Sequence, residues 1–509
     1  MTIPLALTIL IALPLVGALI VAFVPGRETA RLVGLGVAVA TLVWAVVAVL
    51  LPFQVGDGMQ LTEQVAWIKP LGVHYALGVD GLGLLMVLLT AFLVPIVLVA
   101  SKPDADAGGA RGFVGWTLAL EAMSLAVFTA TDVFLFYLVF EATLIPAYFL
   151  IGGFGREGRG RAAIKFLIYQ LVGGLVMLGS VIGLYVVSAN AGAPSYLLSD
   201  LAALDIDPTT QKWLFLGFFI ALAIKAPMFP VHTWLADTTE KTSPGVSVLL
   251  VCVLDKIGTF GMLRFCLGLF PDASRWATPV VVILALISII YGAFVAIGQD
   301  DLLRLIGLTS LSHFGFIVLG IFVFTAEGGA GSILYMVNHG LSTALLFLVA
   351  GYIVRRRGTA SIAAMSGIEK IAPVLAGLFL VAGLAACGLP GLAPFVSEVL
   401  VIISAFDHAW WAGSIAVVAI VLAAIYILWA YQRMMTGPTH PEITGWKDLD
   451  KREVGAIAPL VLTLVLFGFY PAPLLDVINP NVEQTLSQVG AHDDGPSVPA
   501  DQAAQEGQH

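Results

Sequence analysis

Charged residues are scarce in this sequence. Asp, Glu, Lys and Arg make up 11% of its 509 residues, whereas a soluble globular chain has about 25%. Hydrophobic residues reach 59%, and the mean hydropathy is +0.98. The apolar residues form stretches of about 20, long enough to cross a hydrocarbon core of about 30 Å as a helix. These features exclude a soluble enzyme, a nucleic-acid-binding protein and a disordered protein, and they indicate a helical membrane protein with many spans.

Cysteine is also scarce. Cys252, Cys266 and Cys387 all lie in apolar stretches, and the sequence has no CxxC pair and no Cys/His cluster. A disulfide framework, a zinc site and an iron–sulfur cluster are therefore not expected. The sequence also lacks a Gly-rich nucleotide-binding loop between a strand and a helix. We expect that this chain by itself binds no metal, NADH, flavin or cluster and carries out no redox chemistry.

The apolar stretches predict an all-α polytopic membrane protein with about fourteen transmembrane helices. The predicted spans are 3–24, 32–52, 80–100, 113–130, 132–152, 163–188, 211–235, 245–268, 277–298, 303–325, 330–354, 371–406, 411–433 and 455–475. The first stretch is interpreted as a retained helix, because no basic segment precedes it and it has no small-residue cleavage site. The polar residues after Asn479 are predicted to form a disordered tail.

The basic residues predict the orientation of the spans. With the N-terminus outside, most of the 24 Lys and Arg fall in connections on the cytoplasmic side. This agrees with the positive-inside rule and requires an even number of spans, so the C-terminus is also expected outside. Only Lys225 and Lys256 lie near the middle of a span. We therefore expect a multi-pass membrane protein.

Two spans contain residues that a regular helix does not accommodate. Pro227 and Pro230 interrupt span seven, and the segment GLPGLAP, Gly388 to Pro394, interrupts the long span twelve. Such breaks leave carbonyls in the membrane that only protein or water can satisfy. Paired breaks in two halves indicate a transport site built on inverted repeats.

The five-span separation of the breaks predicts the domain organisation. A five-helix unit, spans four to eight, is expected to recur in inverted orientation as spans nine to thirteen. The predicted regions are the N-terminal spans at 1–112, the first repeat at 113–270, the second repeat at 271–436, a loop with span fourteen at 437–478, and the tail at 479–509.

Several other ionisable side chains share the depth of the two lysines. They are Glu121, Glu141, His313, His339 and Glu398. Each alone has a structural explanation, because a lone histidine is usually packed and hydrogen-bonded and a Glu–Lys pair can join two helices. Together they suggest a polar line in the membrane plane, which is typical of a proton or ion path. Protons fit this chemistry best, since buried Glu–Lys pairs and histidines exchange protonation states readily.

These same residues carry a resemblance to a known family. The segments FYLVFEATLIPAYFLIG, AIKAPMFPVHTWLAD, VLDKIGTFGMLR, SLSHFGFIVLG, VNHGLSTALLFLVAG and GLPGLAPFVSEVL resemble the antiporter-like subunits of complex I, the proton-pumping NADH:quinone oxidoreductase. The family includes its subunits L, M and N and related subunits of multisubunit Na⁺/H⁺ antiporters. No lateral helix or extra spans are expected after Pro480, which argues against subunit L. Glu398, where subunit N and the antiporters usually have lysine, resembles subunit M, the mitochondrial subunit 4 type.

The resemblance implies roles for the first-half residues in proton translocation. Glu141 and Lys225 match the family's ion pair beside the broken helix, a proposed switch for uptake from the cytoplasmic side. Lys256 matches the central lysine. Glu121 matches a second carboxylate on span four, with a weaker claim to function.

The resemblance also implies roles in the second half. His313 and His339 match the groups that link the centre to this half, and Glu398 matches the residue from which the proton leaves outward. The implied function is proton translocation in complex I, coupled electrostatically to redox chemistry in other subunits. NADH, FMN, iron–sulfur clusters and quinone are expected in those partners. The neighbouring membrane subunits L and N, the lipid bilayer and protons are the expected partners, and nucleic acid is not. The resemblance also implies a bacterial plasma (inner) membrane, or the mitochondrial inner membrane if the gene is organellar.

Other functions stay open at this point. A subunit of a multisubunit Na⁺/H⁺ antiporter would need no redox partner. A membrane cytochrome could use His232, His313 and His339 as haem ligands, if two of them faced each other across helices. A purely structural anchor would leave the line of buried charges unexplained.

Overall fold

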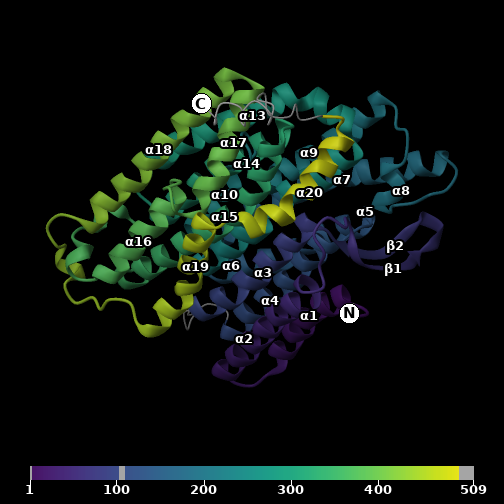
Figure 1. The fold of residues 1–509 in the computed structure, drawn as a ribbon. Coiled ribbons are helices and arrows are strands. Elements are labelled where there is room, and N and C mark those ends of the chain that lie inside the picture. Colours follow the sequence, from purple (N-terminus) through teal and green to yellow (C-terminus); the bar gives the residue numbers. More distant parts are fainter. Residues whose placement is uncertain (1–2, 102–108, 492–509) are drawn as a thin grey trace, which may run out of the picture.

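The computed structural model describes residues 3–101 and 109–491, and it consists mainly of a tilted bundle of long helices (Figure 1). The chain begins with α1 (Ala6–Phe23), α2 (Arg27–Trp44), its π-helical extension η1 (Ala45–Leu50) and, after a hairpin, α3 (Gly81–Ala100). The hairpin comprises β1 (Gln60–Ile68), the turn η2 (Lys69–Leu71) and β2 (Val73–Val79), and its two strands pair antiparallel.

The hairpin is a feature that hydropathy does not reveal. It projects from one side of the bundle in Figure 1. The carboxylate of Glu63, in β1, accepts the backbone N–H of Leu7 at 2.7 Å and so holds the start of α1. The all-helical prediction therefore holds for the membrane-spanning part of the chain and not for this connection.

The next helices form the predicted first repeat. They are α4 (Gly109–Thr129), α5 (Val133–Ala142), α6 (Leu144–Gly153), α7 (Arg159–Asn190), α8 (Leu198–Ala202), α9 (Pro208–Lys225), α10 (Thr233–Lys241), α11 (Pro244–Val248), η3 (Leu249–Leu254), α12 (Lys256–Gly261) and η4 (Met262–Leu267). The last four run on as one continuous span, 244–267, in which η3 and η4 are π-helical.

The remaining helices cover the predicted second repeat and the C-terminal region of the chain. Its elements are α13 (Pro271–Ile297), α14 (Leu302–Phe322), α15 (Ala326–Arg357), η5 (Ile362–Ala364), η6 (Ile368–Lys370), α16 (Pro373–Ala386), α17 (Ala393–His408), α18 (Trp410–Met435), η7 (Pro441–Ile443), α19 (Lys451–Phe469) and α20 (Ala472–Gln488).

Both predicted helix breaks are confirmed. Helix α9 ends at Lys225 and α10 starts at Thr233, while α16 ends at Ala386 and α17 starts at Ala393. At the first break the indole N–H of Trp234 donates to the carbonyl of Ile224 at 3.1 Å, because the helical donor for that carbonyl, the N–H of Met228, bonds to Ala223 instead. At the second break Gly388 and Gly391 have φ of 70° and 91°, a conformation that favours glycine.

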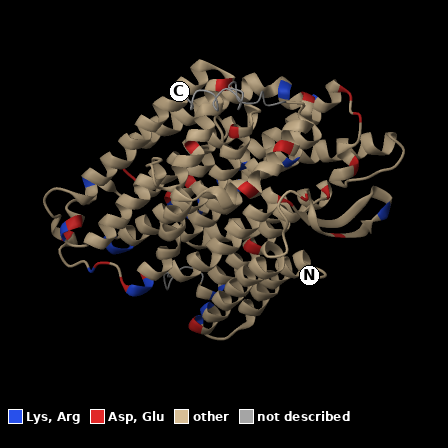
Figure 2. Cartoon of the chain, in the orientation of Figure 1, with Lys and Arg blue, Asp and Glu red and all other residues tan. Residues whose placement is uncertain are grey.

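Twelve helices in the described ranges are long and apolar enough to cross a membrane. The two interrupted helices, α9–α10 and α16–α17, are not among them. The chain is thus a multi-pass membrane protein, while the count of fourteen spans and the inverted repeats stay predictions. Figure 2 shows a bundle made largely of uncharged residues, with many of its Lys and Arg along the lower left margin.

Burial sorts the helices into a centre and a periphery. The most apolar windows of the span 244–267, of α14 and of α15 are entirely buried, whereas those of α1, α2, α7, α18 and α19 are 28–39% buried. The peripheral helices expose large apolar side chains, as a lipid-facing surface requires. The centre of the molecule is therefore built around three helices that carry Lys256, His313 and His339.

The predicted disordered tail is wrong over its described part. Helix α20 continues through Pro480 to Gln488. The physical reason is an amphipathic stripe, because Ile478, Val482 and Leu486 are four residues apart and are all buried against the bundle. The segment has a low mean hydropathy, so a prediction based on hydropathy does not detect this stripe. Residues 492–509 of the predicted tail lie outside the described residues.

Candidate functional site

Lys256 lies at the centre of the bundle and is fully buried. Its Nζ is 2.6 Å from Nδ1 of His339, on α15, and 4.2 Å from the centroid of the Phe314 ring, on α14. The residue begins α12, directly after the π-helical segment η3. Such π-bulges are frequent at functional sites because they shift side chains relative to a regular helix. The contact joins the predicted first repeat to the second.

The two predicted histidines are brought together. The rings of His313 and His339 meet edge to face with centroids 5.2 Å apart. Nε2 of His313 is 3.4 Å from the hydroxyl of Tyr426, on α18, and its ring centroid is 5.9 Å from that of Tyr335, on α15. All four side chains are buried.

Glu398 ends the series of contacts that begins at Lys256. Its Oε1 accepts a hydrogen bond of 2.6 Å from the hydroxyl of Tyr335. The carboxylate fits against Gly388 in the helix break, where a Cβ atom would lie only 1.9 Å from Oε2. The break in span twelve thus makes room for the carboxylate. We call the residues Lys256, His339, His313, Tyr335, Tyr426 and Glu398 the central line.

Glu141 and Lys225 lie on neighbouring elements without a direct ion pair. Nζ of Lys225 is buried, donates to Oγ1 of Thr143 at 3.3 Å and lies 4.6 Å from the centroid of the Phe140 ring. Although both residues are in the described part of the chain, they form no salt bridge within 4.0 Å. The direct pair that the resemblance implies is therefore replaced by electrostatic proximity, with Thr143 holding the ammonium.

Space for the Glu141 carboxylate comes from a glycine, as it does for Glu398. A Cβ atom on Gly174, in α7, would lie 1.7 Å from Oε1 of Glu141. That oxygen has no hydrogen-bond partner within the described residues. At this oxygen the carboxylate is therefore held by packing and not by a hydrogen bond.

Among the described residues, Glu121 has no hydrogen bond to the central line. It is buried in α4, and both its oxygens lack a hydrogen-bond partner among the residues that the structure describes. Thr117 and Ser124, four residues before and three after, also have unpartnered buried hydroxyls. The three side chains form a separate polar stripe on one face of α4.

Sequence reasoning missed three residues of the site, Thr143, Tyr335 and Tyr426. Tyr335 had a usable signal, because it precedes His339 by four residues and so lies on the same helix face. Thr143 follows Glu141 by two residues in the small turn between α5 and α6. Tyr426 had no local signal, since it joins from α18 through tertiary packing alone.

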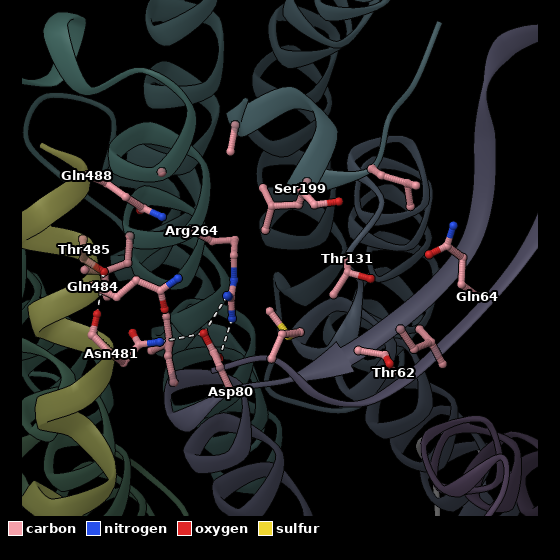
Figure 3. Close-up of a pocket in the computed structure, with 18 of the residues that line it drawn as sticks. Thr62, Gln64, Asp80, Thr131, Ser199, Arg264, Asn481, Gln484, Thr485 and Gln488 are labelled. Carbon is pink, nitrogen blue, oxygen red and sulfur yellow. Dashed lines mark hydrogen bonds and ion pairs between the residues drawn. The ribbon is translucent and has the colours of Figure 1, made fainter. Parts of the chain in front are cut away.

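A cavity of about 420 Å³ lies beside the hairpin, away from the central line (Figure 3). Arg264 and Asp80 form a bidentate ion pair there with both N–O distances at 2.6 Å, and Asn481 of α20 donates to the same carboxylate at 2.6 Å. The Arg264 guanidinium packs 5.1 Å from the centroid of Phe260. Since Phe260 lies between Lys256 and Arg264 in the span, an apolar turn separates this cavity from the central line.

Charged loops join other elements at the bundle ends. Arg304 of α14 contacts Asp237 and Glu240 of α10 at 2.6 and 2.8 Å. In the loop before α14, partial burial opposes ionisation of Asp300, but Ser361, the N–H of Ala363 and Arg433 lower the pKa of this carboxyl below its ordinary value. The Arg304 contacts connect the two predicted repeats, and those of Asp300 lie within the second.

The donor set suits proton transfer better than metal binding. Within residues 3–101 and 109–491 there is no group of three or more His, Cys, Asp and Glu arranged to hold a metal ion. Nδ1 of His339 faces the Lys256 amine, and Nε2 of His313 faces a tyrosine hydroxyl. The two rings touch, so they leave no space between them for a haem plane.

The chain is similar to known membrane proteins over nearly its whole length. Residues 130–423 match the family described as NADH:quinone oxidoreductase/Mrp antiporter, TM. NADH-quinone oxidoreductase subunit M of Mycobacterium tuberculosis is 47% identical, over 97% of this chain and 96% of that protein.

Two solved structures share the fold. A chain of respiratory complex I from Thermus thermophilus matches with a TM-score of 0.87 and 33% identity, covering 95% of this chain and 100% of that one. A chain of the Mrp complex from Dietzia sp. matches with a TM-score of 0.83 and 24% identity, covering 96% and 100%, and it shows the fold alone. The resemblance seen in the signature segments is confirmed: the chain belongs to the NADH:quinone oxidoreductase/Mrp antiporter transmembrane family and, within it, to the subunit M group.

Proposed function

We propose that this chain is the proton-translocating subunit M of a respiratory NADH:quinone oxidoreductase and moves protons outward through its buried ionisable groups. The observation that carries the proposal is the central line, which runs from Lys256 to Glu398 through hydrogen bonds and ring contacts between buried side chains. Ionisable chains at membrane depth are expensive and mark proton or ion paths. The relatives named for this complex support the same assignment.

The contact between Lys256 and His339 supplies the first transfer. An ammonium at Lys256 donates its hydrogen bond to an unprotonated Nδ1 of His339, over 2.6 Å. Moving that proton leaves a neutral lysine and a protonated imidazole, so charge crosses from the first half of the chain to the second. Imidazole can then release a proton from its other nitrogen, which faces away from the lysine.

The tyrosines and Glu398 at the end of the central line provide the route for proton release. The Tyr426 hydroxyl meets His313, and the Tyr335 hydroxyl meets Glu398. A hydroxyl can accept one proton while it donates another, so the two tyrosines can connect the histidines to the carboxylate. Glu398 is the group from which the proton leaves toward the outside.

Uptake is assigned to Glu141 and Lys225. The Lys225 ammonium is held by Thr143 and Phe140 rather than by a direct salt bridge, so its distance from Glu141 can change at small cost. Closing or opening that pair alters the field at Lys256. This is the electrostatic switch through which redox chemistry elsewhere in the complex would drive translocation.

In the proposed complex, other subunits would provide the redox cofactors. NADH, FMN, iron–sulfur clusters and quinone would be bound by other subunits, and the antiporter-like subunits L and N would be the membrane neighbours. This chain would carry no redox chemistry itself. It would lie in a bacterial plasma membrane, or the mitochondrial inner membrane if organellar, with both termini outside, as the distribution of basic residues predicts.

The test compares Glu141→Ala and Lys225→Ala with Glu157→Ala, a loop control, in the assembled complex. NADH-driven proton uptake into inverted membrane vesicles and quinone reduction are measured together. Loss of a positioned acid–base group is expected to slow pumping by about 10²-fold, with the control unaffected. Normal pumping with normal turnover in both variants would contradict the proposed path.

A multisubunit Na⁺/H⁺ antiporter subunit is the second candidate, and the shared Mrp fold favours it. It predicts Na⁺-dependent proton exchange without NADH. Glu398 argues for the first candidate, since the antiporter relatives usually have lysine there. Sodium-driven proton movement in membranes that lack the redox subunits would decide for the second candidate.

A further inference from the structure

Asp255 is a buried carboxylate that the proposed path does not use. It lies at the junction of η3 and α12, directly before Lys256, and it is fully buried. Neither of its oxygens has a hydrogen-bond partner among the described residues. An unpaired carboxylate in such a place is costly, and a charged one much more so. A buried group of this kind calls for a functional explanation.

The packing of α12 shows which way Asp255 faces. Gly258, three residues later and on the same helix face, lies so close to the end of α9 that a Cβ atom would be 2.4 Å from the backbone N of Ala226. Gly261, three residues further, packs equally closely on Leu222. This face of α12 therefore lies against the last turn of α9, which ends at Lys225.

Lys256 faces a different side of the same helix. Neighbouring residues point about 100° apart on a helix of 3.6 residues per turn, and the Lys256 amine lies against α14 and α15. A π-turn precedes Asp255 and Lys256, because the N–H of Asp255 donates to the carbonyl of Leu250 at 2.9 Å. This turn determines that the two side chains face different helices. Both Lys225 and Lys256 are within electrostatic range of the Asp255 carboxylate.

We infer that Asp255 is the proton-relay group between Lys225 and Lys256, carrying the proton from the α9 side of the span to its α15 side. The Lys225 ammonium gives a proton to the Asp255 carboxylate, which leaves a neutral amine and a carboxylic acid. The acid then gives its proton to the neutral Lys256 amine and returns to the carboxylate. The inference rests on the proposed function and adds the missing step between its uptake site and its central line.

The test uses the assembled complex in inverted vesicles. Asp255→Asn keeps the size of the side chain but cannot be a relay, Asp255→Glu keeps the acid, and Thr259→Val is a packing control on the same face, four residues away. Proton uptake per NADH and the rate ratio in H₂O and D₂O are measured. We expect the asparagine variant to pump about 10²-fold more slowly, the lower end of the effects of losing an acid–base group. Its solvent isotope ratio should rise, and the glutamate variant should recover most of the rate.

The outcomes separate this inference from the proposed function. If Lys225→Ala and Lys256→Ala abolish pumping while Asp255→Asn pumps normally, the relay is wrong and the function stands. If the lysine variants also pump normally, the function itself is wrong. A carboxylate with only a structural role would lower the amount of assembled complex in Asp255→Asn and leave pumping per complex and the isotope ratio unchanged. Should that variant not assemble, Asp255→Ser replaces it, and pumping by the serine variant at the wild-type rate would overturn the inference.

Discussion

At the scale of single residues, the two acidic ends of the proposed path share one arrangement. The carboxylates of Glu141 and Glu398 each lie where a neighbouring glycine leaves space, at Gly174 and Gly388. Any larger residue at either position would displace the carboxylate. The position of each carboxylate therefore depends on the missing side chain of the neighbouring glycine.

Replacement of Gly388 tests this arrangement. Gly388→Ala would place a Cβ 1.9 Å from Oε2 of Glu398 and would add about 1–2 kcal/mol of backbone strain at a φ of 70°. We expect slower proton pumping and a lower unfolding temperature. The matched control is Gly377→Ala in α16, where nothing lies within 4 Å of the added Cβ. Equal pumping by the two variants would show that the position of Glu398 does not depend on Gly388.

The Tyr335 hydroxyl gives a second prediction at this scale. Tyr335→Phe removes the 2.6 Å hydrogen bond to Glu398, and such a bond to a charged acceptor contributes about 1.5–3 kcal/mol. Pumping should fall while assembly is retained, because the aromatic ring still fills its buried site. Tyr352→Phe, on the same helix, is the control, since its hydroxyl reaches only a backbone carbonyl at 3.4 Å. Unchanged pumping in Tyr335→Phe would remove this tyrosine from the central line.

At the scale of elements, a polar cluster joins α20 to the bundle in addition to its apolar stripe. Asp80 accepts from the N–H of Gly83 and so caps α3, while it pairs with Arg264 of the central span and accepts from Asn481 of α20. Three elements far apart in sequence therefore depend on a single carboxylate (Figure 3).

Removing the charge of Asp80 should destabilise the protein far more than removing the amide of Asn481. Asp80→Asn leaves the Arg264 guanidinium buried without its counter-charge, at an expected cost of about 3–5 kcal/mol. Asn481→Ala removes one hydrogen bond to a charged group, about 1.5–3 kcal/mol. Thermal unfolding of the purified complex measures both, with Asp57→Asn in the exposed loop as the control. Equal effects of the first two variants would mean that the ion pair does not secure the cluster.

The contact of Asp300 predicts a pH dependence. Its pKa is lowered in the folded protein by Ser361, Ala363 and Arg433, despite the opposing effect of burial. The stabilisation is therefore present above the unfolded pKa, about 4 for aspartate, and is lost as the pH falls through the lower folded value. The unfolding temperature of Asp300→Asn should lie below that of the wild type at pH 7, and the gap should close in acid. A gap that is independent of pH would contradict this assignment.

At the scale of the whole molecule, the charged residues predict the orientation, and the buried helices carry the residues of the proposed path. Basic residues dominate the connections that the positive-inside rule assigns to the cytoplasm. The fully buried windows of 244–267, α14 and α15 bring the two halves together at the Lys256–His339 contact. A proton that crosses this contact passes from one half of the chain to the other.

The predicted orientation can be checked on intact cells. Single cysteines at Asp57, before the hairpin, and at Glu369, between α15 and α16, are introduced into a background without Cys252, Cys266 and Cys387. A membrane-impermeant thiol reagent should label the first position from outside and the second only after the membrane is opened. The reverse pattern would place the termini in the cytoplasm.

Much of this protein was determined by the sequence alone, because hydropathy and proline act locally. The apolar stretches specify the membrane class, Pro227 and the GLPGLAP segment specify where the helices break, and the ionisable residues inside spans indicate the proposed site. The tertiary structure alone decided which of those groups touch. It placed Lys256 on His339, separated Glu141 from Lys225, added Tyr426 from a distant helix and ordered α20 against the bundle. Those contacts depend on how each helix is rotated about its axis and on which neighbouring surface covers its apolar stripe. Such packing joins residues far apart in the chain, so no local stretch of sequence can predict it.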